Sequence, residues 1–230
     1  MINFVCVYYG TKYSLDYVQV LYNMVQRHLT VPHKFICFSD HVKPQKLLKG
    51  DITFRKFKHH DYDGWWNKLQ LFSEEAHLIG PCLYLDLDVV ILDNIDEIAT
   101  FGDDMTFGVI NDFNSGTKEF NSSVMKFNNE VATKVIWNKF LEDKANLMAL
   151  QGDQNVMTKL IKSNKKIAQD NLKVMPDEWT FSYKWYSRID PRFGKARWTF
   201  EKKPNTKIAV FHGHPRPHES EQKWVQKEWN

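Results

Sequence analysis

Short apolar runs alternate along the chain with segments of helical spacing. Runs typical of strands lie at residues 2–9, 35–38, 52–57, 82–92, 106–110, 171–175 and 207–211. From Leu15 to Leu29, apolar residues recur at the spacing that places them on one face of a helix. Similar spacing predicts helices at 62–72, at 131–141 and from 151 onward, while 120–127 is expected to be a loop that enters a strand. This alternation predicts an α/β protein.

The most apolar run, Cys82–Leu92, contains two carboxylates. Gly80-Pro81 marks a turn before it, and the run is typical of a strand buried on both faces. Asp86 and Asp88 come at its C-terminal end, where residues two apart project to the same side. Two adjacent carboxylates repel each other, and their burial is costly. A hard divalent cation such as Mg²⁺ or Mn²⁺ removes both problems. The alternative is that these aspartates only open a surface loop.

Other polar side chains are predicted at the same edge. The strand–helix–strand beginning is of a nucleotide-binding type, in which ligands collect at the carboxyl ends of strands. Tyr8 and Tyr9 end the first predicted strand and Asp40 follows the second, so we expect all three at this edge, with Tyr8 and Tyr9 at the nucleotide site. Lys68 lies near the start of a predicted helix, where it can reach a phosphate. The alternative for Lys68 is a solvated surface lysine.

The composition is that of a globular protein. Of 230 residues, 43% are hydrophobic and 26% charged, which allows one α/β domain with a full core. The net charge of +3 is too balanced for phosphate-driven nucleic-acid binding. Cys6, Cys37 and Cys82 lie in predicted strands, so we expect buried free thiols in a reducing compartment. The chain starts with a strand, and no apolar run is long enough to cross a bilayer, so we expect a cytoplasmic protein without an integral membrane segment.

Residues 1–218 are predicted to form a single catalytic domain. Within it, residues 176–204 are rich in Trp, Tyr and Arg and poor in periodicity, and we interpret them as a lobe or lid over the site. Residues 219–230 are expected to be a polar tail with at most one turn of helix.

Four motifs in order along the chain resemble those of glycosyltransferases with the GT-A fold. The resemblance covers residues 2–218 and is strongest to family 8, the glycogenin and bacterial galactosyltransferase group. It implies a Rossmann-like nucleotide-diphospho-sugar transferase fold, with a mixed, mostly parallel sheet flanked by helices. The motifs are Leu83-Tyr84-Leu85-Asp86-Leu87-Asp88, Asn121-Ser122-Ser123-Val124, Gly152-Asp153-Gln154 and His212-Gly213-His214-Pro215-Arg216-Pro217, with Trp66-Asn67-Lys68-Leu69 upstream.

The resemblance also implies an activity and a metal site. The chain would be a metal-dependent glycosyltransferase that moves a hexose from a nucleotide-diphosphate sugar, with UDP favoured, to a glycan, glycolipid or protein acceptor. Asp86, Asp88 and His212 would bind Mn²⁺ or Mg²⁺, and Asp86 would also contact the ribose. Lys68 and Arg216 would hold the diphosphate, whose growing charge the metal and these cations neutralise.

The same resemblance assigns the reacting sugar to three residues. Asn121 would face the donor sugar, Asp153 would hydrogen-bond to it, and Gln154 would lie near the anomeric carbon. Because an amide cannot act as a general base, we expect retention of the anomeric configuration. If the reaction inverts, Asp153 is the candidate base. The alternative is that Asp153 only caps a helix and Gln154 is a surface residue.

The chain departs from the family 8 pattern at two places. The C-terminal motif is compressed and has Arg216 where lysine is usual, which leaves His214 as a rival to His212. Ser123 replaces the usual glycine. Two other functions share parts of this pattern. A haloacid-dehalogenase-like phosphohydrolase also has Asp-x-Asp after an apolar strand, but there the nucleophile normally lies on the first strand. A non-catalytic nucleotide-sugar-binding protein would leave the ligand set unexplained.

Overall fold

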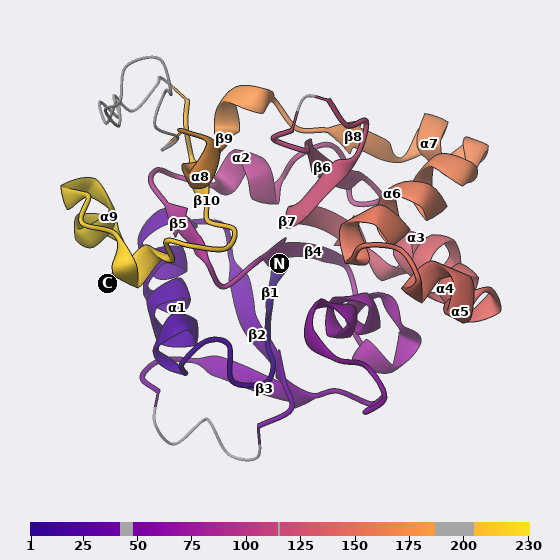
Figure 1. The fold of residues 1–230 in the computed structure, drawn as a ribbon, viewed down its shortest axis with the longest axis horizontal. Coiled ribbons are helices and arrows are strands. Elements are labelled where there is room, and N and C mark those ends of the chain that lie inside the picture. Colours follow the sequence, from indigo (N-terminus) through magenta and orange to yellow (C-terminus); the bar gives the residue numbers. More distant parts are fainter. Residues whose placement is uncertain (42–47, 115, 187–204) are drawn as a thin grey trace.

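A seven-stranded sheet in the order β3-β2-β1-β4-β7-β6-β8 divides the molecule (Figure 1). The structure is a computed structural model that describes residues 1–41, 48–114, 116–186 and 205–230. Strands β1 to β4 are parallel, β7 is antiparallel to both of its neighbours, and β8 is parallel to β6. The strands are β1 (Ile2–Tyr8), β2 (His33–Ser39), β3 (Ile52–Lys56), β4 (Pro81–Leu85), β6 (Phe107–Asn111), β7 (Phe120–Asn128) and β8 (Leu172–Val174). The predicted mixed, mostly parallel sheet is confirmed.

A smaller sheet lies on one side of the large one. Its strands are β5 (Val89–Ile91), β10 (Ile208–Val210) and β9 (Thr180–Ser182), with β10 in the centre. Together with α1 (Asp16–His28) it covers one face (Figure 1). The predicted single strand over 82–92 is therefore wrong, because the chain leaves one sheet after Leu85 and enters the other at Val89. The two carboxylates lie in the turn between, where they need not be buried inside a strand.

The helices on the other face come from two parts of the chain, one between β3 and β4 and one after β7. They are the 3₁₀ helices η2 (Gly64–Phe72) and η3 (Glu74–Ala76), then α3 (Asn129–Ala132), the π-helical turn η4 (Thr133–Trp137), α4 (Asn138–Glu142), α5 (Lys144–Met148), α6 (Asp153–Ser163) and α7 (Lys165–Asp170). The helix predicted over 131–141 is thus interrupted by a π turn, and 120–127 is a strand throughout rather than a loop entering one. Between the sheets and near the C-terminus lie α2 (Asp96–Ala99), η5 (Asp177–Trp179), α8 (Tyr183–Tyr186), η6 (Pro217–Glu219) and α9 (Lys223–Glu228).

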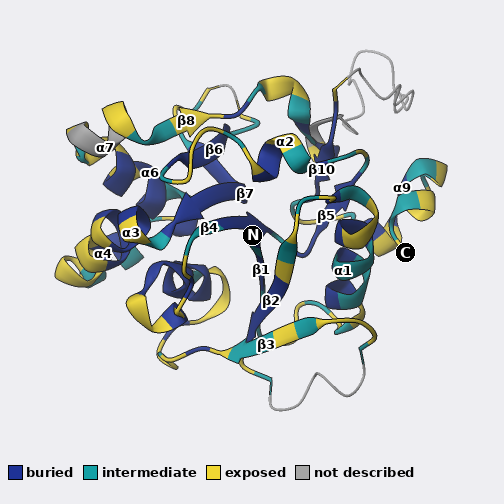
Figure 2. Ribbon diagram, turned by 180° about the vertical axis from the view of Figure 1, so that it is seen from behind, coloured by how far each residue is buried: buried dark blue, intermediate teal, exposed yellow. Residues whose placement is uncertain are grey.

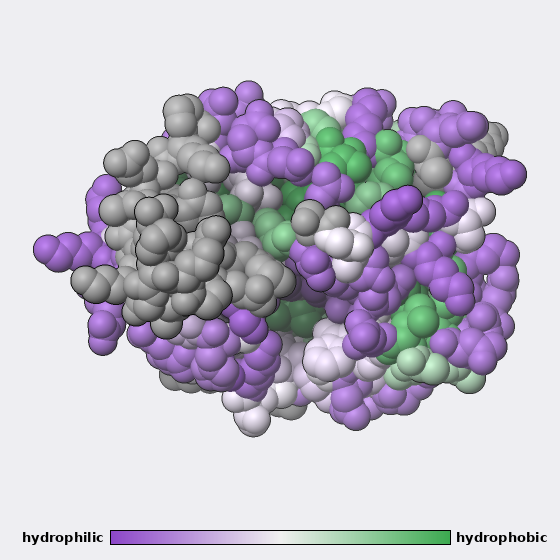
Figure 3. All heavy atoms as spheres, turned by 45° about the horizontal axis from the view of Figure 1, so that its top comes forward, coloured by the Kyte–Doolittle hydropathy of each residue, from purple (hydrophilic) through white to green (hydrophobic). Residues whose placement is uncertain are grey.

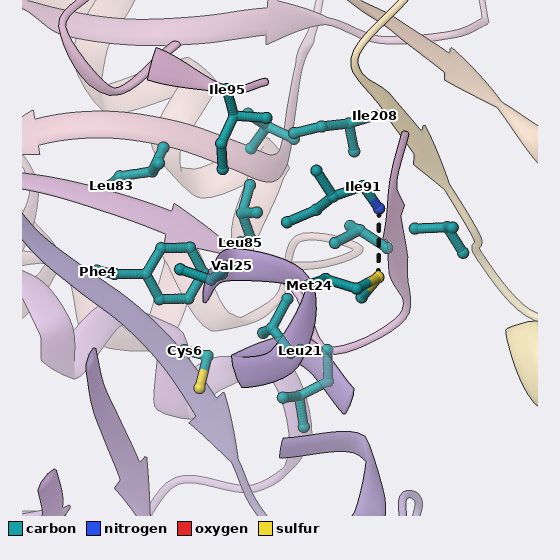
Figure 4. Close-up of a cluster of buried hydrophobic side chains, with 14 of the residues drawn as sticks. Phe4, Cys6, Leu21, Met24, Val25, Leu83, Leu85, Ile91, Ile95 and Ile208 are labelled. Carbon is teal, nitrogen blue, oxygen red and sulfur yellow. Dashed lines mark hydrogen bonds between the residues drawn. The ribbon is translucent and has the colours of Figure 1, made fainter. Parts of the chain in front are cut away.

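The sheet separates two apolar cores. One lies between the sheet, α1 and the small sheet, and the other lies beneath η2, α3, α4 and α6. In the first core, Leu21 and Met24 of α1 pack towards β5, where the amide of Ile91 lies 3.4 Å from the Met24 sulfur (Figure 4). Central strands are buried on both faces, whereas the edge strand β3 is partly exposed (Figure 2). The three cysteines are buried free thiols, as expected.

The last residues are folded onto the domain rather than forming the expected tail. Val225 of α9 is fully buried, and Trp229 packs edge-on against Tyr17 of α1 at 4.9 Å between ring centroids. Arg27 binds the backbone carbonyls of Glu228 and Asn230. Of the predicted lobe, 176–186 forms η5, β9 and α8, and 187–204 lies outside the described residues. In the described part of the chain, no helix is both long and apolar enough to cross a bilayer.

Candidate active site

A cavity of about 530 Å³ opens at the carboxyl ends of β1 and β4. Because β1 to β4 are parallel, the loops that follow them meet at this edge of the sheet. The start of β7, the start of α6 and the loop after β10 complete the walls. On the face of the molecule that Figure 3 shows, most of the surface is hydrophilic, with smaller hydrophobic areas between. The lining includes Tyr9, Lys12, Tyr13, Trp65, Lys68, Tyr84, Asp86, Asp88, Asn121, Ser122, Ser123, Asp153, Gln154 and His212.

An irregularity in β7 turns its first residues toward the cavity. Opposite β6, Asn121 pairs with Ile110 and Met125 pairs with Val109, so residues 122–124 have no partner on that side. Such a bulge bends the strand and re-aims its side chains. On the other side the amide of Asp86 donates to the carbonyl of Ser123 at 3.0 Å. The Asn-Ser-Ser motif is thereby fixed beside the carboxylates.

Lys68 joins two of the predicted site carboxylates. Its ammonium lies 3.0 Å from Asp86 and 3.1 Å from Asp153, and it donates to the Ser122 hydroxyl at 3.0 Å. Ser122 in turn donates to Asp153 at 2.8 Å. Burial opposes the charged form of Lys68, but Asp153 and Asp86 outweigh it and raise the lysine pKa. Lys68 is thus not the solvated surface lysine of the alternative but a buried countercharge of this cluster.

Asp86 and Asp88 differ in their surroundings. Asp86 accepts from the Tyr84 hydroxyl at 2.5 Å, and although burial acts to raise its pKa, Lys68 and hydrogen bonds lower it below the usual value. Asp88 accepts from the Tyr13 hydroxyl at 2.6 Å. Burial, followed by the charge of Asp86, raises the pKa of Asp88 to about 6. The negative charges of Asp86 and Asp88 thus repel each other, and a bound cation would relieve this repulsion.

His212 reaches the same cavity from the small sheet. The amide of Phe211 donates to the Asp88 carbonyl at 3.0 Å, which ties the end of β10 to the acidic turn. The His212 ring lies parallel to Phe113 at 6.2 Å, and its Nε2 is 2.5 Å from the Ser182 hydroxyl. Burial, with the charge of Lys184, lowers the His212 pKa, so the imidazole is neutral, as metal ligation requires. His214 instead pairs with Glu219 at 2.9 Å and does not line the cavity.

The predicted metal ligands fit a divalent cation by their chemistry. Two carboxylates and a neutral imidazole line one cavity, and burial, followed by the charge of Asp86, raises the pKa of Asp88. No group of three or more His, Cys, Asp or Glu side chains in the described residues is already close enough to hold a metal. Asp86, Asp88 and His212 are the residues of this cavity that would hold a cation.

Asp153 and Gln154 open α6 at the far wall. Gly152 is the N-cap, and the Asp153 side chain makes no capping bond, so the helix-cap alternative is wrong. Gln154 lines the cavity, and its amide nitrogen lies 3.3 Å from Asp112. It is therefore not a plain surface residue. Asn121 also lines the cavity, with its side-chain oxygen accepting from the Ser123 amide at 2.9 Å.

Of the remaining predicted site residues, Tyr9 lies in the cavity lining, whereas Tyr8 and Arg216 do not. Tyr9 lines the cavity, and its hydroxyl donates to Asp63 at 2.9 Å. Tyr8 is buried and stacks on His41 at 4.5 Å, away from the cavity lining. Arg216 lies behind Tyr13, with its guanidinium 5.3 Å from that ring and 2.7 Å from the Lys12 carbonyl. Arg216 is not among the residues that line the cavity, and its buried Nε has no hydrogen-bond partner among the described residues.

Comparison with known proteins gives the fold. No family model and no curated protein matches the chain. Among solved structures, an active-site mutant of LgtC with glutamate in place of glutamine superposes with a TM-score of 0.68 at 16% identity, over 98% of this chain and 93% of that one. The galactosyltransferase LgtC in complex with donor and acceptor sugar analogues gives 0.60 at 16% identity, over 94% and 88%.

The glycosyltransferase GlyE of Streptococcus pneumoniae TIGR4 gives 0.68 at 14% identity, over 99% of this chain and 63% of GlyE. The chain has the GT-A glycosyltransferase fold. The predicted fold class and the resemblance on which it was based are confirmed at this level. The GT-A fold agrees with the order of the four motifs and not with the haloacid-dehalogenase-like alternative.

Sequence reasoning missed several residues of this GT-A cavity. Tyr13 holds Asp88, Tyr84 holds Asp86, and Ser122 links Lys68 to Asp153. Tyr84 and Ser122 lie inside two of the four motifs. Their polar side chains close to the predicted site residues could have marked them as part of the site. Tyr13 lies in a loop without periodicity, so only the fold brings it to Asp88. Trp65 gave no signal separate from the adjacent Trp66.

Proposed function

We propose that this chain is a metal-dependent glycosyltransferase that moves a hexose from a nucleotide-diphosphate sugar, with UDP favoured, to a glycan, glycolipid or protein acceptor. The observation that carries the proposal is the one cavity lined by Asp86, Asp88 and His212 together with Asn121 and Gln154. The fold shared with LgtC and GlyE supports it. A cytoplasmic location and a UDP-linked donor belong to the same proposal.

The residues of the chain have distinct tasks in this proposal. Bound by Asp86, Asp88 and His212, Mn²⁺ or Mg²⁺ would supply positive charge to the diphosphate leaving group. Tyr13 orients Asp88, and Lys68 holds Asp86 and Asp153 in fixed positions while balancing their charge. Such preorganised charges cost no rearrangement during the reaction. Arg216, with an unused donor, is the candidate for a further diphosphate contact.

Retention of the anomeric configuration is part of the proposal. An inverting enzyme needs a general base behind the anomeric carbon. Asp153, the candidate base, is already engaged by Lys68 and Ser122, and Gln154 is an amide. The mutated LgtC has a glutamine in its active site, which supports a similar place for Gln154.

A thermal-shift screen tests the proposal. UDP-, GDP- and CDP-sugars are added to the chain with Mn²⁺ or with EDTA. A donor at about 100 times its Kd stabilises the folded state by about 2.7 kcal/mol, which raises the Tm of a chain of this size by about 5–10 °C. We expect this rise for a UDP-sugar with Mn²⁺, and a much smaller one in EDTA. If no nucleotide-sugar raises the Tm in the presence of Mn²⁺, the proposed function is wrong.

A further inference from the structure

One large aromatic side chain at the cavity is left without a structural task. Trp65 is 57% exposed, whereas its neighbour Trp66 packs against the core beneath η2. The other large exposed hydrophobic residues in the described part of the chain are Met1, Ile79, Leu141 and Val174, and none of these four lines the cavity. Single exposed apolar residues are common, so exposure by itself has little meaning. What singles out Trp65 is its position in the lining of the cavity.

Trp65 stands beside the residues predicted to act on the sugar. An added Cβ at Gly152 would lie 3.6 Å from the indole nitrogen, which places the Trp65 ring against the N-cap of α6. The next two residues of that helix are Asp153 and Gln154, and both line the same cavity as the indole. The ring thus forms part of the cavity wall beside the start of α6.

The indole of Trp65 is also unused by the protein. Within the described residues it makes no aromatic stacking contact, receives no cation on its face, and its Nε1–H donates no hydrogen bond. Tryptophan with a free polar atom and a wet, open face is suited to a ligand that is apolar on one side and hydroxylated at its edge. A pyranose ring has this form, because its axial C–H groups make an apolar face and its hydroxyls point outward.

The polar side chains that line the same cavity suit the same ligand. Gln154 and Asn121 carry amides in the cavity, and Asp153 carries a carboxylate. These groups donate to and accept from hydroxyls. An aromatic wall facing a few directed polar groups is the usual construction of a small-ligand site.

We propose that Trp65 is the stacking platform for the terminal sugar of a carbohydrate acceptor, which selects a glycan over a protein or lipid surface at this site. The inference rests on the proposed function and narrows the acceptor class that it left open. The acceptor sugar would stack on the indole and receive a hydrogen bond from Nε1, with a hydroxyl directed toward Gln154. The donor nucleotide would occupy the opposite end of the cavity, near Tyr13 and Asp88.

The test measures sugar binding separately from donor binding. Methyl α- and β-glycosides of glucose, galactose and N-acetylglucosamine are titrated into the full chain with UDP and Mn²⁺ and followed by saturation-transfer NMR. We expect at least one glycoside to bind, and Trp65→Ala to weaken it by about tenfold, the loss expected for one aromatic contact. Trp65→Phe should recover most of this loss. Ile79→Ala, at a more exposed apolar side chain outside the cavity lining, should change nothing.

The outcomes separate this inference from the proposed function. Trp65→Ala should leave the affinity for UDP unchanged, measured by calorimetry in Mn²⁺. If UDP binds but no glycoside does, or if Trp65→Ala binds glycosides as well as the wild type, the platform is overturned while the transferase proposal stands. Equal weakening of UDP and glycoside by Trp65→Ala also overturns it, because the indole would then belong to the donor site. Failure of every nucleotide-sugar to bind overturns the proposed function itself.

Discussion

At the residue scale, the charge balance of the cavity depends on Asp88. Asp86 has Lys68 as a countercharge, whereas Asp88 has the Tyr13 hydroxyl and the adjacent charge of Asp86. A cation is therefore expected to gain most of its binding energy from Asp88. The sequence could show the pair of carboxylates, but not this inequality, because Tyr13 is 75 residues away in the chain.

Asp88→Asn should remove the metal dependence of nucleotide binding and leave the fold intact. The amide still accepts a hydrogen bond from Tyr13 but lacks the charge that a cation requires. A lost charged contact is worth about 1.5–3 kcal/mol, so we expect UDP affinity in Mn²⁺ to fall about tenfold to a hundredfold. Calorimetric titration with UDP measures it, with wild type in EDTA as the reference. Unchanged Mn²⁺ dependence in the variant would show that Asp88 is not a ligand.

Lys68→Met should destabilise the protein, because it leaves Asp86 and Asp153 without their countercharge. Removing one partner of a buried ion pair costs about 3–5 kcal/mol. We expect the lower end, since the Asp86 side chain keeps 24% of its exposure. Urea unfolding measures the change, and Lys68→Arg, which retains the charge, is the matched control and should lose less. Equal stability of Lys68→Met and wild type would contradict the cluster.

At the element scale, α9 is the clearest difference between sequence and structure. Its pattern is short and polar, and only two Trp and one Val offer apolar surface, so the sequence favoured a tail. Those residues find partners on α1, on β9 of the small sheet and on α8, which lie close in space but far away in sequence. In contrast, α1 was predictable because five of its buried residues recur at helical spacing over 13 residues.

Val225→Asp should destabilise the domain if α9 is part of its core. Val225 is fully buried, and an unpaired carboxylate there costs several kcal/mol. We expect the free energy of unfolding to fall by about 3 kcal/mol or more. Lys227→Ala, at an exposed position of the same helix, should stay within about 0.5 kcal/mol. Chemical denaturation compares the two. Similar values for both variants would mean that the segment is a tail after all.

At the scale of the whole molecule, the sequence predicted the sheet and most of its strands because their apolar runs are continuous. It did not predict the change of sheets between Leu85 and Val89, since one unbroken apolar run covers both strands. The candidate site was likewise predicted in part. Residues on strand ends and in motifs, such as Asp86, Asn121 and His212, meet in the cavity as expected. Tyr8 does not, because its side chain points into the first core.

The arrangement of the two sheets also explains why residues from both of them line a single cavity. The turn from Asp86 to Asp88 links them covalently, and the bond from Phe211 to Asp88 links them again. The proposed metal ligands therefore depend on both sheets, so a change in how the sheets pack would separate His212 from the carboxylates. The central claim thus concerns the molecule as a whole, and turnover tests it.

The most direct test follows donor turnover by proton NMR. UDP-glucose, UDP-galactose and UDP-N-acetylglucosamine, all α-linked, are incubated with the chain in Mn²⁺, with or without a glycoside acceptor, and with Asp88→Asn as the control. We predict that one donor is consumed only with Mn²⁺ and only by the wild type, and that the first sugar product carries an α-anomeric proton. A β-anomeric product would contradict retention. Consumption of no donor, or equal consumption in EDTA and by Asp88→Asn, would contradict a metal-dependent glycosyltransferase.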